Sequence, residues 1–156
     1  MTHVQETVDI AAPIEEVFAV ITDPERSPEW SADVIEVRDV SDEPVQEGAT
    51  WQQVVRIAGR PVNLQCRIVE LRPPYEGVVQ ISGDHQGRIR THCEATEKGT
   101  RVTQEIDFVP PGGILGRVAG GLVGPAMKRE LRRSLERMRE TLEGQAGEEG
   151  GARTSQ

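Results

Sequence analysis

The sequence predicts one α+β domain in which a curved antiparallel sheet wraps around a long C-terminal helix. A length of 156 residues fits one hydrophobic core. Short turns join most of the strand-like segments, which makes neighbouring strands antiparallel. The helical segments are grouped at two points of the chain instead of alternating with the strands, and this order is typical of the α+β class.

The chain opens with a strand that is followed by two short helices. Residues 4–10 alternate between apolar and polar side chains, which predicts a strand. Apolar residues then recur every three or four positions over 14–21, as on one face of a helix. Pro13 suits the first turn of this helix, and the residue before Pro24 avoids the α region, so the helix ends there. Residues 25–32 can form the second short helix.

Six further strands follow, separated by turns that contain glycine, proline or charged residues. We expect them at residues 34–40, 50–57, 62–71, 77–82, 88–95 and 100–109.

A stripe of large apolar residues marks one face of the last helix, with steps of three and four positions. It consists of Met127, Leu131, Leu135, Met138 and Leu142. We expect this stripe to cover the sheet and the helix to end at Gly144. The folded domain then spans 1–143, and residues 144–156 form a disordered tail because no large apolar side chain follows.

The segment 112–125, which leads into this stripe, is unusually rich in glycine. Each glycine weakens a helix by up to about 1 kcal/mol relative to alanine. The glycines indicate close packing of the helix start on the sheet, a flexible gate over a cavity, or a loop that touches a membrane.

Alternation along the strands brings three polar side chains, Gln53, Thr91 and Gln104, onto the apolar face of the sheet. A buried amide without a hydrogen-bond partner costs about 1–3 kcal/mol. Either these groups find partners among themselves or nearby, or the space they face holds water or a ligand. We predict a ligand pocket lined by Trp30, Trp51, Gln53, Thr91, Gln104, Met127 and Leu131.

No motif for a catalytic triad, a phosphate loop or a metal site is present. Glu6 and Glu70 share the parity of apolar neighbours and are candidates for interior carboxylates, although their places near strand ends favour solvation. His92 should point outward, and Cys66 and Cys93 are typical small core residues. The catalytic residues, if any, are unknown, and no metal or cofactor is expected.

The formal net charge of -8 argues against nucleic-acid binding, which needs a positive surface. Six basic residues nevertheless lie between Lys128 and Arg139. They indicate the wet face of an amphipathic helix or, alternatively, a surface for an anionic partner. The two cysteines form no disulfide framework, and we see no signal peptide and no apolar run of about 20 residues that could span a membrane. We therefore expect a cytoplasmic protein.

Several segments resemble the polyketide cyclase/dehydrase-like members of the START/Bet v 1-like superfamily, also called SRPBCC. The similarity covers roughly residues 3–143 and is carried by IAAPIEEVF at 10–18, DPERSPEW at 23–30, VQEGATW at 45–51, GTRVT at 99–103 and the ending from Gly113 into the last helix. The resemblance implies a helix-grip fold with a cavity between the sheet and the long helix. It also implies binding of lipids, hormones, polyketides or other apolar molecules. The family has no shared catalytic motif, so no catalytic residue follows from the resemblance.

Three functions are open at this point. The first is binding or carrying a small hydrophobic or aromatic metabolite. The alternative is a polyketide cyclase or dehydratase, in which polar groups of the pocket position the substrate and stabilise an enolate. The third is a module that binds a partner protein through the basic face of the last helix. The sequence predicts no oligomeric state.

Overall fold

Seven strands of this chain form one continuous antiparallel sheet in a computed structural model. The structure describes the backbone of residues 2–57, 59–109 and 113–154, and the side chains of residues 2–57, 59–109 and 124–144. The elements in chain order are β1 (Thr2–Ile10), α1 (Ile14–Ile21), the 3-10 helix η1 (Pro24–Arg26), α2 (Ser27–Trp30), β2 (Val34–Arg38), β3 (Thr50–Ile57), β4 (Arg60–Arg72), β5 (Glu76–Gly83), β6 (Gln86–Thr96), β7 (Gly99–Val109) and α3 (Gly113–Thr154).

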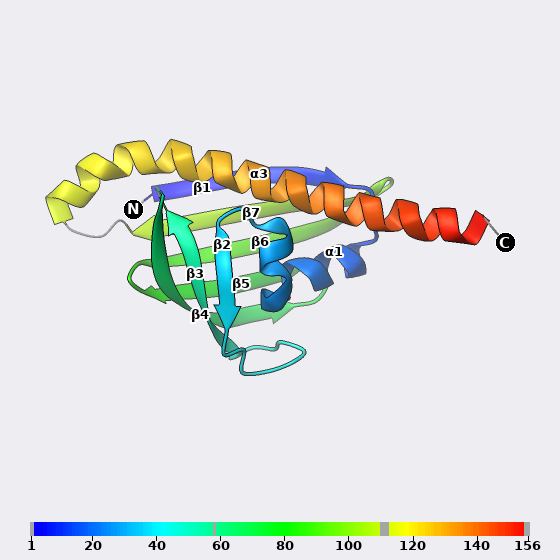
Figure 1. Ribbon diagram of the computed structural model, residues 1–156, viewed down its shortest axis with the longest axis horizontal. Helices are drawn as coiled ribbons and strands as arrows, with labels where there is room; N and C mark the ends of the chain where they lie inside the picture. The colour runs from blue at the N-terminus through cyan, green and yellow to red at the C-terminus, as the bar shows by residue number, and fades with distance from the viewer. Residues whose placement is uncertain (1, 58, 110–112, 155–156) are drawn as a thin grey trace.

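The order of strands in the sheet is β1-β7-β6-β5-β4-β3-β2, and all neighbours are antiparallel. The sheet curves, and α3 runs along β1 at one border of the molecule (Figure 1). The predicted α+β class, the seven strands, the two short helices after the first strand and the long last helix are all confirmed. Strand β2 is shorter than predicted and ends at Arg38.

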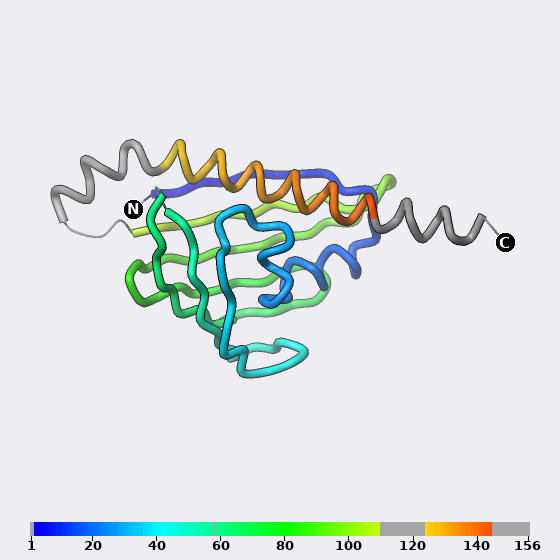
Figure 2. The backbone as a smooth tube through the Cα atoms, in the orientation of Figure 1, coloured from blue at the N-terminus to red at the C-terminus, as the bar shows by residue number. Residues whose placement is uncertain are grey.

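The apolar stripe of α3 packs onto the inner face of β1. Leu131, Leu135 and Met138 are 5%, 1% and 0% exposed, and they contact a cluster that includes Val4 and Val8 of β1. Figure 2 shows the start of β1 beside the described part of α3. The predicted contact between the stripe and the sheet is therefore confirmed.

The end of α3 differs from the prediction. The helix does not stop at Gly144 but continues to Thr154. The segment 144–154 contains four glycines, which lower helix stability, together with glutamine, alanine and glutamate residues, which favour helices. The side chains of 145–156 lie outside the described residues, so the disordered tail stays a prediction. The side chains of 113–123 also lie outside them, which leaves the interpretations of the glycine-rich segment open.

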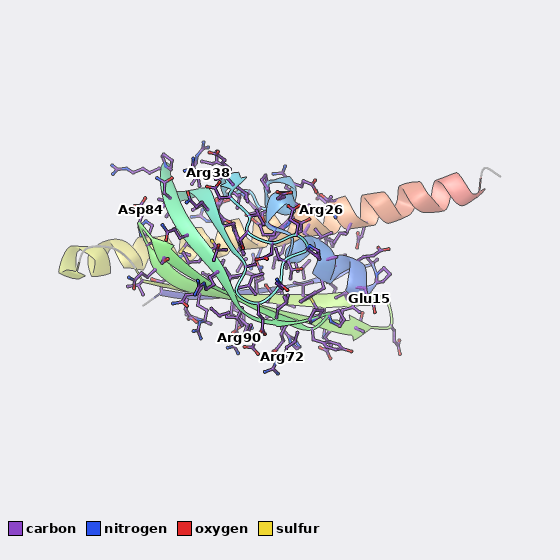
Figure 3. The ribbon with its side chains drawn as sticks, turned by 90° about the horizontal axis from the view of Figure 1, so that it is seen from below. Glu15, Arg26, Arg38, Arg72, Asp84 and Arg90 are labelled. Atoms are coloured by element: carbon purple, nitrogen blue, oxygen red, sulfur yellow. The ribbon has the colours of Figure 1, made fainter. Side chains whose placement is uncertain are left out.

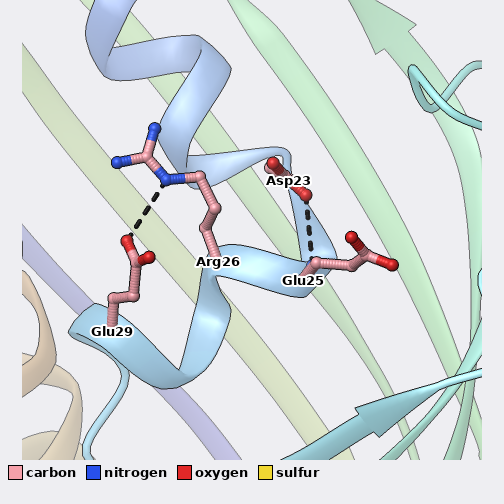
Figure 4. Close-up of polar contacts among 4 residues, drawn as sticks. All are labelled: Asp23, Glu25, Arg26 and Glu29. Atoms are coloured by element: carbon pink, nitrogen blue, oxygen red, sulfur yellow. Dashed lines mark hydrogen bonds and ion pairs between the residues drawn. The ribbon is translucent and has the colours of Figure 1, made fainter.

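Local hydrogen bonds hold the turn between α1 and α2. The Thr22 hydroxyl donates to the carbonyl oxygen of Phe18 (2.7 Å), and this bond closes the last turn of α1. The Asp23 carboxylate accepts from the backbone N–H of Glu25 (3.1 Å), while Arg26 donates to Glu29 (3.2 Å), as Figure 4 shows. Asp23 therefore caps η1, and the pair of Arg26 and Glu29 links η1 to α2.

The turn after α2 is fastened to α3. The backbone N–H of Ala32 donates to the buried hydroxyl of Ser134 (3.1 Å). The next residue, Asp33, is half-buried, and burial together with the nearby Glu130 raises the pKa of its carboxyl group to about 6, although Arg133 and Arg56 act in the opposite direction. Near pH 5, Asp33 is therefore mostly protonated in the folded protein.

The outer face of the sheet is charged. Figure 3 shows Arg72 and Arg90 on the far side of the sheet from Arg26 and the short helices. His92 is exposed on this face beside Glu76 (3.5 Å), as its parity predicts. None of the helices has, within the described residues, an apolar stretch long enough to cross a membrane.

We expect Leu135→Ala to lower the free energy of unfolding by about 2–5 kcal/mol, because it leaves a cavity beneath α3. Urea unfolding followed by circular dichroism measures the loss. A loss well below 1 kcal/mol would contradict the packing of the stripe on β1.

We expect Asp33→Asn to remove a pH-dependent loss of stability. The folded-state pKa of about 6 lies above the usual 3.8, so between these values the folded protein keeps a proton that the unfolded chain releases. Stability therefore falls as pH rises from about 4 to 6. The variant should be more stable than the wild type by about 1 kcal/mol at pH 7.5, after allowing for the partial exposure of Asp33. The test compares the urea unfolding midpoints of wild type and Asp33→Asn at pH 4.5 and 7.5, with the exposed Asp39→Asn as the control. An equal change of midpoint with pH in wild type and Asp33→Asn would contradict the prediction.

Candidate functional site

The apolar interior is divided into two clusters. One lies among α1, α3, β1 and the adjoining parts of β6 and β7, and includes Phe18, Cys93 and Leu135. The other lies on β3, β4 and β5, and includes Trp51 and Ile68. Leu71 of β4 packs against both clusters, so the two clusters meet beside this residue.

A cavity of about 50 Å³ lies between the short helices and the inner face of the sheet. The helical wall is made by Ile21, Thr22, Pro24 and Ser27. The sheet wall is made by Trp51, Ile68, Leu71, Gly77, Val78, Val79 and Thr91. This volume accepts a few water molecules or a small organic group, whereas sites for drug-sized ligands are typically about 300–1,000 Å³. A ring-sized ligand therefore requires the two walls to move apart.

Gly77 and a bulge in β4 explain why the sheet is hollowed at this point. The sheet register aligns Leu71, Gly77, Thr91 and Gln104 in one row across β4, β5, β6 and β7. Gly77 has no side chain to fill the middle of this row. A Cβ atom there would lie 3.7 Å from Leu71 and 3.8 Å from Thr22, so the space that the missing side chain leaves between the two walls is about the size of one methyl group.

The bulge in β4 determines which face of the sheet the Glu70 side chain lies on. The register shifts between Ile68 and Glu70, so the simple alternation that put Glu70 on the inner face does not hold. Glu70 instead pairs with Arg72 (2.9 Å) and is one-third exposed, while Leu71 lines the cavity. The favoured prediction of a solvated Glu70 agrees with this geometry.

The three polar side chains of the predicted pocket find protein partners. The indole N–H of Trp51 donates to the Gln53 carbonyl oxygen (3.1 Å). The Gln104 amide donates to the Thr91 hydroxyl (3.1 Å), and these two residues are 6% and 7% exposed. The sequence left two explanations for these inward polar groups, local hydrogen bonds or contact with water or a ligand. Local hydrogen bonds are present for all three. Two of the predicted site residues, Trp51 and Thr91, also line the cavity.

The other predicted site residues lie beside α3. Trp30 and Leu131 are buried in the cluster between α3 and β1, and Met127 is partly buried against it. The indole N–H of Trp30 is buried and has no hydrogen-bond partner among the described residues. None of these three residues belongs to the described lining, and their contact with a ligand stays a prediction.

Two kinds of candidate reactive group lie away from the cavity. The Glu6 side chain is 11% exposed and pairs with Arg132 of α3 (3.1 Å). Burial raises the pKa of both Cys66 and Cys93 to about 12, so both thiols are neutral at physiological pH. The two cysteines are buried in the apolar clusters, which confirms their interpretation as small core residues.

The basic face of α3 forms a separate and larger hollow of about 460 Å³ on the surface. Its lining consists only of charged residues, Arg129, Arg132, Arg133, Glu136, Arg137 and Glu140. An apolar molecule would gain little from this surface, because its burial there would desolvate charges. The cavity beneath the short helices is therefore the better candidate for a small-molecule site.

The sequence analysis missed most of the helical wall and the glycine of the sheet wall. An isolated glycine within a strand pattern, as at position 77, is a known sign of a bulge or a close approach. Leu71 faces the cavity because of the bulge in β4, and the alternation of apolar and polar residues does not predict this bulge. Ser27 and Thr22 line the cavity because the short helices fold back onto the sheet, and the sequence pattern does not predict this tertiary contact.

Comparison with solved structures supports the helix-grip description of this fold. A protein of Thermus thermophilus, TTHA0849, matches with a TM-score of 0.78 at 18% identity, over 91% of this chain and 97% of that chain. A START superfamily protein of Mycobacterium smegmatis matches with a TM-score of 0.67 at 18% identity, over 91% of this chain and 99% of that chain.

Comparison of sequences finds a distant relative and a family. The relative is Toxin Rv0910 of Mycobacterium tuberculosis, 26% identical over 140 residues, which are 87% of this chain and 94% of the relative. Residues 1–143 match the sequence model of the family described as "Polyketide cyclase / dehydrase and lipid transport". This match covers almost the whole chain, and the curved sheet, the long helix and the cavity agree with it. The chain therefore belongs to the polyketide cyclase/dehydrase and lipid transport family.

Proposed function

We propose that this protein binds or carries a small hydrophobic or aromatic molecule in the cavity between the short helices and the sheet. The observation that carries the proposal is the mainly apolar cavity beside Leu71, where the two apolar clusters meet. Burying apolar surface in this space contributes roughly 25 cal/mol per Å² to binding. The family description, which includes lipid transport, supports the same class of ligand.

The cyclase or dehydratase alternative has less support. General acid–base catalysis needs a titratable group within hydrogen-bond reach of the substrate. The described lining contains hydroxyl groups but no carboxyl, imidazole, thiol or amino group. Hydroxyl groups can orient a substrate, but they are weak acids and bases, so carrying a ligand fits this lining better than transforming it.

We further propose that the carrier works in the cytoplasm without a nucleic-acid partner. Two buried, unpaired thiols fit a reducing compartment. The net charge of -8 would repel a polyanion at long range.

The two indole N–H groups provide a direct test with ethylbenzene as the probe. Trp51 lines the cavity, whereas Trp30 packs beside α3, so we expect the Trp51 indole resonance in a ¹H–¹⁵N spectrum to shift saturably and the Trp30 resonance to shift less. A dissociation constant near or below about 1 mM, roughly -4 kcal/mol, is reasonable for so small a ligand. Trp51→Phe assigns the two resonances. If neither indole responds to ethylbenzene or to larger neutral aromatic compounds, the carrier proposal fails.

Gly77→Val should fill the cavity at a modest cost in stability. A Cβ atom at this position would already contact Leu71 and Thr22, so the two methyl groups of valine would crowd the space between the walls. We expect a slightly lower melting temperature and at least about tenfold weaker binding of ethylbenzene. Gln80→Val, on the exposed outer face of the same strand, is the matched control and should bind as the wild type does. Wild-type affinity in Gly77→Val would show that the ligand sits elsewhere.

A further inference from the structure

The cavity is lined entirely by neutral side chains. Its only polar side chains, within the part of the chain that the structure describes, are the hydroxyl groups of Thr22, Ser27 and Thr91. A charged ligand group would lose its hydration there without gaining an opposite charge, and this costs several kcal/mol or more. The chemistry of the lining therefore favours an uncharged ligand.

The three hydroxyl groups differ in what they can offer a ligand. Thr22 already donates its hydrogen to the carbonyl oxygen of Phe18. Ser27 begins α2 and is only partly buried, so water can reach its surroundings. Thr91 is 7% exposed in the middle of the sheet, on a strand that is paired on both sides.

Gln104 fixes the direction of the Thr91 hydroxyl. Because its amide N–H donates to the Thr91 oxygen (3.1 Å), one lone pair of that oxygen is occupied and the hydroxyl hydrogen is left for another acceptor. Gln104 itself lies directly opposite Thr91 in the register, away from Gly77 and the hollow of the sheet. The Thr91 hydrogen is therefore available on the cavity side of this pair.

We propose that Thr91 is the specificity-determining residue of this cavity, and that it donates a hydrogen bond to a carbonyl or similar acceptor oxygen of an uncharged aromatic ligand. The proposal rests on the proposed binding function and deepens it. Gln104 is a positioning residue, because it acts on the ligand through the orientation of Thr91. The ligand class is thus a neutral aryl ketone, quinone or ester, in contrast to a carboxylic acid or a pure hydrocarbon.

Three single-ring compounds of nearly equal shape separate the contributions: ethylbenzene, acetophenone and benzoate. Their dissociation constants at pH 7.5 are measured from the shifts of backbone amide and indole resonances in wild type, Thr91→Val, Thr91→Ser, Gln104→Leu and the control Gln80→Val. We expect wild type to bind acetophenone about five- to tenfold more tightly than ethylbenzene, the gain from one satisfied hydrogen bond, and benzoate at least tenfold more weakly than acetophenone.

The variants assign this preference. Thr91→Val should abolish the preference for acetophenone over ethylbenzene, while Thr91→Ser should keep this preference. Gln104→Leu should reduce the preference without abolishing it, and the control Gln80→Val, on the exposed outer face, should retain it. Two results would overturn the role of Thr91 while leaving the binding function intact, provided that ethylbenzene binds. One is an undiminished preference for acetophenone in Thr91→Val. The other is binding of benzoate as tight as that of acetophenone. If none of the three compounds binds, the binding function and this inference are both overturned.

Discussion

The packing of α3 along β1 is the contact on which the rest of the structure depends. The stripe through Leu131, Leu135 and Met138 buries the inner face of β1 and the adjoining strands in one cluster. The inner face of β3 and β4 belongs to a second cluster, and the short helices α1, η1 and α2 cover the junction. Because α3 packs mainly along β1, the short helices cover the inner face of β4 and β5. The cavity lies beneath these helices, where Gly77 places no side chain.

Several polar side chains of the interior are arranged in pairs, whereas the buried indole N–H of Trp30 has no partner among the described residues. Gln53 pairs with Trp51 and Gln104 with Thr91, while Glu6 pairs with Arg132 at the border of α3. In each pair one hydrogen bond is made within the protein, so the orientation of both side chains is fixed. The exposed ion pairs on α3, such as Arg133 with Glu130, contribute little to stability because water surrounds them.

Much of this architecture could be predicted from the sequence, because strand alternation and helix periodicity are local patterns. The seven strands and the stripe of α3 follow from them, as does the inward direction of Gln53, Thr91 and Gln104. The lining of the cavity could not be predicted in the same way. The bulge in β4 reverses the parity after Ile68, and only the paired strand β5 reveals it. The positions of Ser27 and Thr22 depend on how the short helices fold back, which is a tertiary contact.

The two walls of the cavity have different mechanical properties, and this separates ligand selection from ligand size. The sheet wall is held by strand pairing on both sides of β4, β5 and β6, so Thr91 and Gly77 keep fixed positions. The helical wall has no such backbone pairing with the sheet. It is held by the side chains of Val17, Phe18 and Trp30, which pack into the cluster beside α3, and by the hydrogen bond from Ala32 to Ser134. A ligand larger than the present 50 Å³ must therefore displace the helices and not the strands. Chemical selectivity then belongs to the rigid sheet wall, while tolerance of ligand size belongs to the short helices.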